Sequence, residues 1–239
     1  MAEQEVAKHT KKIFKIIGAK ENSFWHKLKD FLTEIIIIVF AVTISIWFHN
    51  NSEHRHQQED VKTFLLGLQK DLTADIAEMQ DDKHSYEMQK AVFSYIYHTK
   101  PGEKLNRDSL DYYYNWIYNT TGLNPNNGRF EGFKSSGKIG FIENDSLQND
   151  IMDLYQENIP SLLTATTSYV SHKNMLFEYL QKTLRRSTDS TTNLADVLNT
   201  EEAHNISRVL SSTNEITGRY DATINKMRKI IAEIRKEYE

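Results

Sequence analysis

Residues 31–48 read FLTEIIIIVFAVTISIWF and form the most apolar run of this 239-residue chain. In an α-helix this run rises about 1.5 Å per residue and covers roughly 27 Å, close to the ~30 Å hydrocarbon core of a bilayer. The apolar part of a cleaved signal peptide is shorter and precedes small residues, whereas this run ends in Trp47 and Phe48. The sequence therefore predicts one uncleaved transmembrane helix over residues 31–49.

Positive charge is distributed unequally around the predicted transmembrane helix. Residues 1–33 carry seven lysines against four acidic residues, whereas only Arg55 and Lys62 follow the helix closely. The positive-inside bias places the lysine-rich side in the cytoplasm. Trp25 and Trp47 stand near the two ends of the run, where tryptophan anchors a helix at the membrane interface. We predict a cytoplasmic basic segment (1–30), contact with the lipid bilayer, and a domain on the outer side (50–239).

The composition of the remaining chain favours an all-α fold. Nine glycines and three prolines are too few for a turn-rich β-sandwich, and 11% aromatic residues argue for a folded domain. The chain has no cysteine, which excludes disulfides, thiolate metal sites and thiol redox chemistry. The part that follows residue 33 is acidic overall, so we expect no nucleic-acid partner.

Apolar spacing predicts that the transmembrane helix continues directly into a long amphipathic helix. Spacings of three, four and seven recur at Val61, Leu65, Leu68, Leu72, Ile76, Met79, Tyr86, Phe93 and Ile96. A helix over 53–97 would be about 67 Å long, and Pro101 and Gly102 would end it. Further elements are expected as a helix over 109–119 capped near Asp108 or Ser109, an irregular region over 121–145, a helical system over 147–186 interrupted at Pro160, a linker over 187–199, and a last helix over 201–238.

Two stretches resemble a known family. The first contains Glu34-Ile35, His49-Asn50-Asn51, Leu68 and Lys70-Asp71-Leu72; the second contains Phe133-Lys134-Ser135-Ser136-Gly137-Lys138, Ile139, Ile142-Glu143-Asn144, Leu147 and Leu154-Tyr155. In order and spacing they are similar to a Bacteroidota family of single-pass inner-membrane proteins catalogued as a domain of unknown function. That family usually places Trp where this chain has Ser52. The resemblance implies a bacterial inner membrane and a periplasmic helical domain, and it implies no activity.

Residues 132–138 have the glycine and lysine spacing of a phosphate-binding loop. That loop requires a Ser or Thr after its lysine to bind magnesium, and this chain has Ile139 there. No hydrophobic strand precedes the stretch either. We therefore predict a short helix over 129–136, ended by Gly137 in the left-handed conformation, and a second helix capped by Asn144.

Two sets of polar residues near the membrane are candidate sites. His49, Glu53 and His56 fall on one helix face, so they are weak metal-ligand candidates whose commoner interpretation is a solvated histidine cluster. Glu34 is a carboxylate beside four isoleucines, about one turn inside the cytoplasmic end, and such residues often mark ion paths or partner contacts. The alternative is that it reaches headgroup water or pairs with a nearby lysine.

No set of nucleophile, base and orienting residue can be assembled from the sequence, and no cofactor motif is present. We therefore expect a membrane-anchored periplasmic helical bundle that acts as a scaffold, assembly or sensing protein without catalytic activity. The alternative is an accessory subunit of an ion-driven or secretion machine. The long apolar stripe and the polar Glu34, Thr43 and Ser45 also suggest a homo-oligomer, because helices in lipid bury such groups against copies of themselves.

Overall fold

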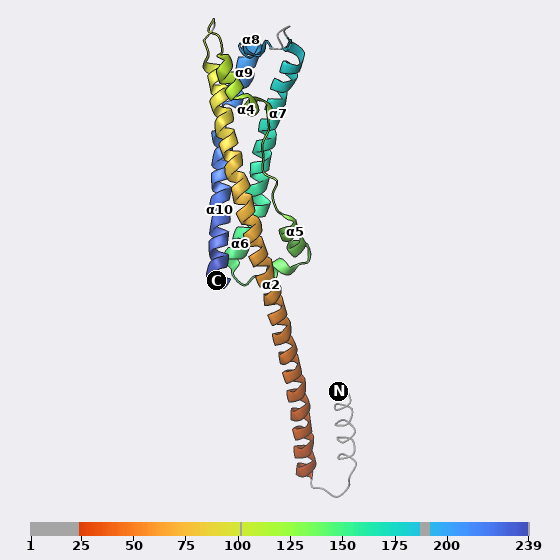
Figure 1. The fold of residues 1–239 in the computed structure, drawn as a ribbon. Helices are drawn as coiled ribbons and strands as arrows, with labels where there is room; N and C mark the ends of the chain where they lie inside the picture. Colours follow the sequence, from red (N-terminus) through yellow and green to blue (C-terminus); the bar gives the residue numbers. More distant parts are fainter. Residues whose placement is uncertain (1–23, 101, 187–191, 239) are drawn as a thin grey trace. The chain divides into compact units, whose positions relative to one another are not determined.

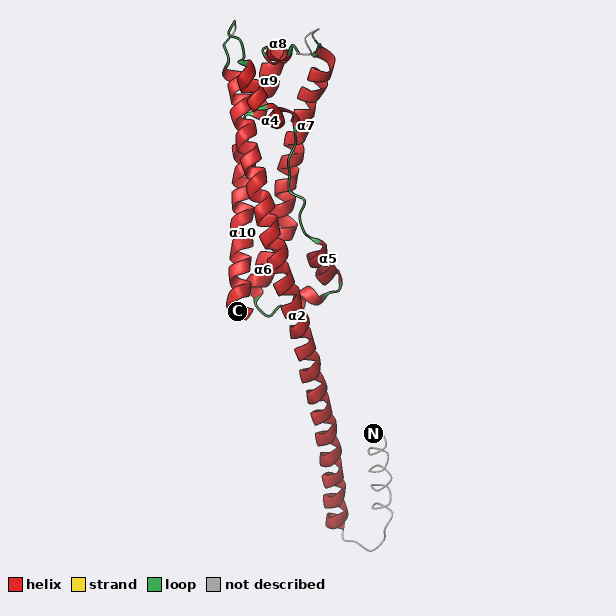
Figure 2. Cartoon of the chain, viewed as in Figure 1, coloured by secondary structure: helices red, strands yellow, loops and turns green. Residues whose placement is uncertain are grey.

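The computed structural model describes residues 24–100, 102–186 and 192–238, and these residues form helices and the loops that connect them (Figures 1 and 2). This part of the chain contains no β-strand; Arg186 and Thr192 form one isolated antiparallel bridge. The predicted all-α class is confirmed. The prediction for the basic segment falls largely on residues 1–23, which lie outside the described residues.

The longest element is α2 (Phe24–His98), a single helix of 75 residues. Between its ends the sequence has no proline and one glycine, Gly67, so nothing interrupts the backbone hydrogen bonding. The helix ends three residues before Pro101, and Gly102 has a φ of 88°. The predicted continuation of the apolar run into a long amphipathic helix is confirmed.

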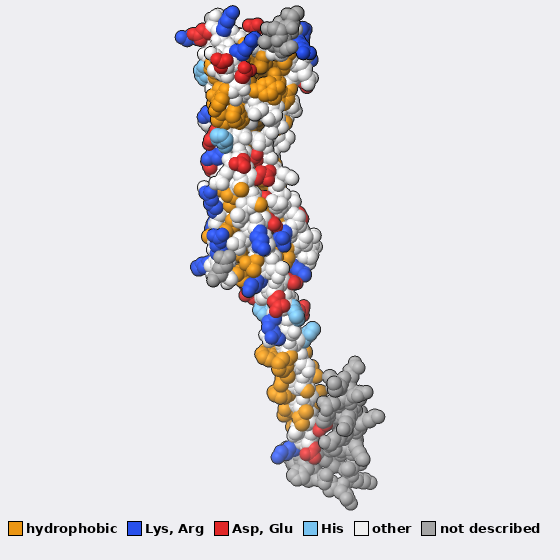
Figure 3. All heavy atoms as spheres, in the orientation of Figure 1, with side chains coloured by type: hydrophobic (Ala, Val, Ile, Leu, Met, Phe, Trp, Pro, Cys, Tyr) orange, Lys and Arg blue, Asp and Glu red, His pale blue; other side chains and the backbone are white. Residues whose placement is uncertain are grey.

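Contacts divide the chain into two units, residues 1–60 and residues 61–239. In the first unit, α2 is long and apolar enough to cross a membrane, which makes it a candidate span near the N-terminus. Its large apolar side chains are exposed, for example Ile36 (66%) and Phe40 (65%), and Figure 3 shows them along this part of the helix. This exposure distinguishes the segment from the buried core helix of a soluble protein.

The second unit contains the rest of the described elements. They are α3 (Arg107–Tyr112), α4 (Tyr114–Tyr118), α5 (Gly128–Ser135), the 3₁₀ helix η1 (Lys138–Phe141), α6 (Asp145–Asp153), the π-helical turn η2 (Leu154–Asn158), α7 (Ile159–Thr183), α8 (Leu194–Leu198), α9 (Glu201–Leu210) and α10 (Asn214–Tyr238). The second part of α2, α7 and α10 run alongside one another (Figure 1). The apolar stripe of α2 is buried among them from Val61 to Ile96, with Ile76 only partly covered.

Several predicted boundaries are wrong. The helix expected over 109–119 is two helices separated at Tyr113, and its cap is Asn106, whose side chain accepts a hydrogen bond from Ser109 N. The linker expected over 187–199 contains α8, whose Val197 and Leu198 are buried. The last helix is broken between Leu210 and Asn214, so α10 is about 38 Å long instead of the expected ~57 Å.

Pro160 interrupts the third helical system, as predicted. The π-helical turn η2 lies directly before α7, and Pro160 occupies the first turn of α7. Proline has no N–H to donate, and its ring clashes with the carbonyl four residues earlier, so the regular α-helical ladder cannot continue through it. The chain thus passes from α6 into α7 with a local change in winding instead of a loop.

Candidate functional site

The first candidate is the carboxylate within the candidate span. Of residues 31–48, Glu34 alone has a buried side chain, 7% exposed. The hydroxyls of Thr43 and Ser45 donate within α2, to Val39 O at 2.8 Å and Ala41 O at 2.9 Å. These two hydroxyls are therefore satisfied inside their own helix. Glu34 stays a candidate for a functional role because it is a buried charged side chain within the candidate span.

The histidine-rich turns after the candidate span are exposed. His49 Nε2 lies 3.8 Å from Glu53 Oε2, and His56 Nδ1 lies 3.8 Å from Glu59 Oε2. The described part of the chain contains no group of three or more His, Asp or Glu side chains that could hold a metal ion. Within one chain, His56 pairs with Glu59 and does not join His49 and Glu53.

The two tryptophans predicted as interface anchors flank the apolar run, and Gly137 ends the helix before it. Trp25 belongs to the first turn of α2, and Trp47 is 61% exposed, with its ring edge-on to Phe48 at 5.1 Å. Gly137 follows α5 with a φ of 74°, a conformation that glycine adopts without strain. Residues 132–135 are helical, so their backbone amides do not curl into a phosphate cradle.

The structure reveals a row of carboxylates on α2 that binds the connecting segment 119–127 and the first turn of α5. Each member receives a hydrogen bond from a residue beyond α4: Asp71 from Arg129 Nε (2.8 Å), Asp75 from Asn126 N (3.2 Å) and Nδ2 (2.5 Å), Glu78 from Asn124 N (2.8 Å), and Asp82 from Thr121 Oγ1. Spacings of four, three and four place all four carboxylates on one helix face. The connecting segment is thereby fixed along α2, although it has no regular secondary structure.

Two carboxylates of this row are buried. Burial raises the pKa of Asp75 and of Asp82 above the ordinary value of 3.8, although the hydrogen bonds from Asn126, Thr121 and Tyr220 act in the opposite direction. A raised carboxyl pKa favours folding at low pH, and this contribution is lost as the pH rises through the raised pKa. At neutral pH the donors of the connecting segment offset the cost of burying these charges.

Lys173 of α7 is completely buried, and its ammonium group binds carbonyl oxygens at the end of α4. Its Nζ donates to Gln89 Oε1 at 2.7 Å, to Trp116 O at 2.8 Å and to Asn119 O. Three acceptors match the three protons of an ammonium group. No ion pair involves Lys173 in the described part of the chain, and burial lowers its pKa from 10.5 to about 7. This lysine therefore connects α2, α4 and α7 with backbone and amide oxygens only.

Three tyrosines connect α7, α2 and α10 in the middle of the domain. The ring of Tyr86 lies edge-on to Tyr169 (5.2 Å between centroids) and tilted against Tyr220 (5.8 Å). The hydroxyl of Tyr86 donates to Thr121 O, that of Tyr169 donates to Leu210 O, and that of Tyr220 donates to Asp82 Oδ2. Every phenol thus has a partner, as buried tyrosines require.

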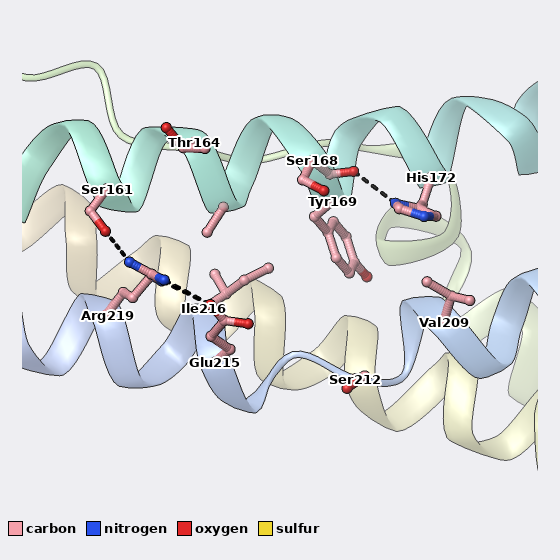
Figure 4. Close-up of a pocket in the computed structure, with 11 residues that line it drawn as sticks. Ser161, Thr164, Ser168, Tyr169, His172, Val209, Ser212, Glu215, Ile216 and Arg219 are labelled. Atoms are coloured by element: carbon pink, nitrogen blue, oxygen red, sulfur yellow. Dashed lines mark hydrogen bonds and ion pairs between the residues drawn. The ribbon is translucent and has the colours of Figure 1, made fainter.

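A groove lies between α7 and the α9–α10 region, and Tyr169 is one of its lining residues (Figure 4). Its volume is about 520 Å³, within the range of small-molecule sites. It is lined by Ser161, Thr164, Ala165, Ser168, Tyr169 and His172 of α7, by Val209 and Ser212, and by Glu215, Ile216 and Arg219 of α10. The small and hydroxyl residues of α7 recur at helical spacing, and the break between α9 and α10 lies opposite them.

The polar groups of the groove are held in place by neighbouring atoms. Arg219 donates to Glu215 Oε1 through Nε (3.2 Å) and Nη2 (2.8 Å), and to Ser161 Oγ through Nη1. His172 Nδ1 lies 2.9 Å from Ser168 O, and because a carbonyl oxygen only accepts, Nδ1 is the donor of this hydrogen bond. Both ends of the groove therefore present a positioned polar group.

Sequence patterns did not identify the carboxylate row, Lys173 or the groove. Each depends on pairs of residues more than 35 positions apart, for example Asp82 with Thr121 and Lys173 with Gln89. A signal for the row was present, because carboxylates at helical spacing share a face with an apolar stripe. Comparison with known proteins returned nothing: no family model matches the chain, and no curated protein or solved structure matches it.

Proposed function

We propose that this chain is a single-pass protein of a bacterial inner membrane, with a cytoplasmic N-terminus and a helical domain in the periplasm that acts in scaffolding, assembly or sensing without catalysis. The observation that carries this proposal is α2, because one uninterrupted helix supplies both the candidate span and the buried stripe of the domain. The lysine-rich sequence before the span supports the orientation. The family resemblance supports the compartment.

Sensing is favoured over a purely structural role by the groove between α7 and α10. A scaffold needs no cavity, whereas a sensor needs a site for a small molecule and a connection from that site to the membrane helix. Tyr169 lines the groove and contacts Tyr86 of α2. The alternative function, an accessory subunit of an ion-driven or secretion machine, is supported by the buried carboxylate of Glu34 in the span.

A mass-resolved pull-down from native membranes distinguishes these functions. The chain is isolated in mild detergent, and its intact complexes are weighed before and after release of small molecules. Sensing predicts a complex of this chain alone that carries a small molecule in the groove. Stoichiometric copurification with other membrane proteins, retained in variants that close the groove, would favour the accessory subunit instead.

Homo-oligomerisation also belongs to the proposal, with neighbouring spans in contact near Glu34. The apolar stripe of α2 does not support it, because that stripe is buried within the chain. Support comes from the polar turns 50–60, most of which are exposed in the single chain. The predicted arrangement places the histidine-rich turns round a shared axis.

Cysteine crosslinking tests whether the chain forms an oligomer. Because the chain has no native cysteine, every disulfide must come from the introduced residue. Single cysteines replacing Ser45 and Ser52, seven residues apart on one face of α2, are expected to give disulfide-linked dimers in membranes. Thr43→Cys, about half a turn away from Ser45, is the matched control and is expected to give less dimer. Monomeric bands at all positions round the helix would contradict the oligomer.

A further inference from the structure

The strongest unassigned feature is a partly used guanidinium in the groove between α7 and α10. The Arg219 side chain is 38% exposed. Among the described residues, Nε, Nη1 and Nη2 each donate one hydrogen bond, two to Glu215 and one to Ser161. A guanidinium has five N–H groups, so each terminal nitrogen keeps one N–H for a ligand. Two such N–H groups are what a carboxylate requires for bidentate binding.

The surroundings of Arg219 favour a ligand with a single negative charge. Of the described residues that line the groove, Arg219 is the one permanently charged cation, and the Glu215 carboxylate beside it carries the opposite charge, so the pair is neutral overall. A polyphosphate or a dicarboxylate would lie beside the Glu215 carboxylate without a second cation to balance it. A monocarboxylate adds one negative charge only, and its two oxygens can accept the two N–H groups that Arg219 still offers.

The rest of the groove favours a polar body on the ligand. Figure 4 shows Ser161, Thr164, Ser168 and His172 along the α7 side, with Ser212 on the opposite wall. From residue 161 to residue 172 the helix rises about 16 Å, so the row of hydroxyls continues well beyond the guanidinium. Ala165 and Ile216 supply apolar contact between these polar groups. Hydroxyl or amide groups on a ligand would find both donors and acceptors along this length.

We propose that this groove binds a small monocarboxylate whose body carries hydroxyl or amide groups, with the carboxylate on Arg219. The inference deepens the proposed sensing function and rests on it for its biological meaning. Bound ligand lies against Tyr169, whose hydroxyl donates to Leu210 O at 3.1 Å and whose ring contacts Tyr86 of α2. A ligand in the groove is therefore connected, through the contact between Tyr169 and Tyr86, to the helix that contains the candidate span.

Isothermal titration calorimetry on the full chain in detergent micelles tests the binding site. The probes are gluconate and N-acetyl-trialanine, and their neutral counterparts are glucitol and N-acetyl-trialanine amide. At least one acid is expected to bind at least tenfold more tightly than its neutral counterpart, because only the acid uses the free N–H groups of Arg219. Absence of binding by both acids, or equal binding of acid and neutral counterpart, would overturn the inference.

Substitutions locate the site on the chain. Arg219→Gln is expected to weaken binding of the acid by about 10- to 100-fold, because a charge-assisted bond is lost. Arg228→Gln is the matched control, since Arg228 is exposed on the same helix and does not line the groove. Circular dichroism shows whether each variant retains its helical content. Unchanged affinity in the helical Arg219→Gln variant would also overturn the inference.

Failure of this inference and failure of the proposed function give different results. A chain that binds the acid through Arg219 but has the opposite membrane orientation would retain the binding site and lose the proposed periplasmic role. A correctly inserted chain that binds neither acid would retain the membrane-anchored role and lose the monocarboxylate site.

Discussion

Replacing Lys173 with methionine is expected to change how the stability of the domain depends on pH. Burial lowers the pKa of Lys173 from 10.5 in the unfolded chain to about 7. Between these two values the unfolded state binds more protons than the folded state, so the free energy of unfolding of the unmodified protein rises with pH. The slope of this contribution is up to about 1.4 kcal/mol per pH unit, which amounts to about 4 kcal/mol between pH 7 and pH 10.

The Lys173→Met variant lacks this contribution. Urea titrations in detergent micelles, followed by circular dichroism at each pH, give the free energy of unfolding of both proteins. The difference between the unmodified protein and the variant is expected to become more positive as the pH rises from 7 to 10. Groups common to both proteins, including the buried tyrosines whose pKa burial raises, cancel in this difference. Parallel pH profiles would show that Lys173 does not titrate in the folded domain as described.

The second large effect is expected from Tyr86→Ala. Tyr86 is completely buried, its ring contacts Tyr169 and Tyr220, and its hydroxyl donates to Thr121 O at 2.9 Å. Truncation of a large buried aromatic side chain removes apolar burial, leaves a cavity and leaves one carbonyl without its donor. The variant is expected to lose about 3–5 kcal/mol of unfolding free energy.

Tyr97→Ala provides the matched control for Tyr86→Ala. Tyr97 lies in the last turns of the same helix and is 39% exposed, so its truncation is expected to cost less than about 1 kcal/mol. Chemical denaturation of both variants measures the two losses under one condition. Equal losses would mean that the tyrosine contacts between α2, α7 and α10 do not hold the domain together.

Features that depend on neighbouring residues could be predicted from the sequence. The absence of proline and near absence of glycine between residues 24 and 98 predicted an uninterrupted helix, and Gly137 predicted the end of the short helix before it. The interruption at Pro160 could be predicted for the same reason, because the missing N–H of proline disrupts the helix within one turn of its own position. Local stereochemistry determines each of these features.

Features that depend on distant residues could not be predicted. The break between α9 and α10 follows no glycine or proline, and both helices pack against α7. The buried Lys173 looks like a surface lysine in the sequence, because its acceptors Trp116 O and Asn119 O come from a different part of the chain. The groove likewise needs α7 and α10 to lie together before Arg219 and Ser161 can meet.

Protease protection in spheroplasts tests the central claim most directly, with one epitope tag at each end of the chain. We expect added protease to remove the region after Asn50, including the C-terminal tag, and to spare the tail before Asp30 with the N-terminal tag. Lysed spheroplasts serve as the control, because both tags then become accessible. Loss of the N-terminal tag from intact spheroplasts, with retention of the C-terminal tag, would contradict the proposed arrangement.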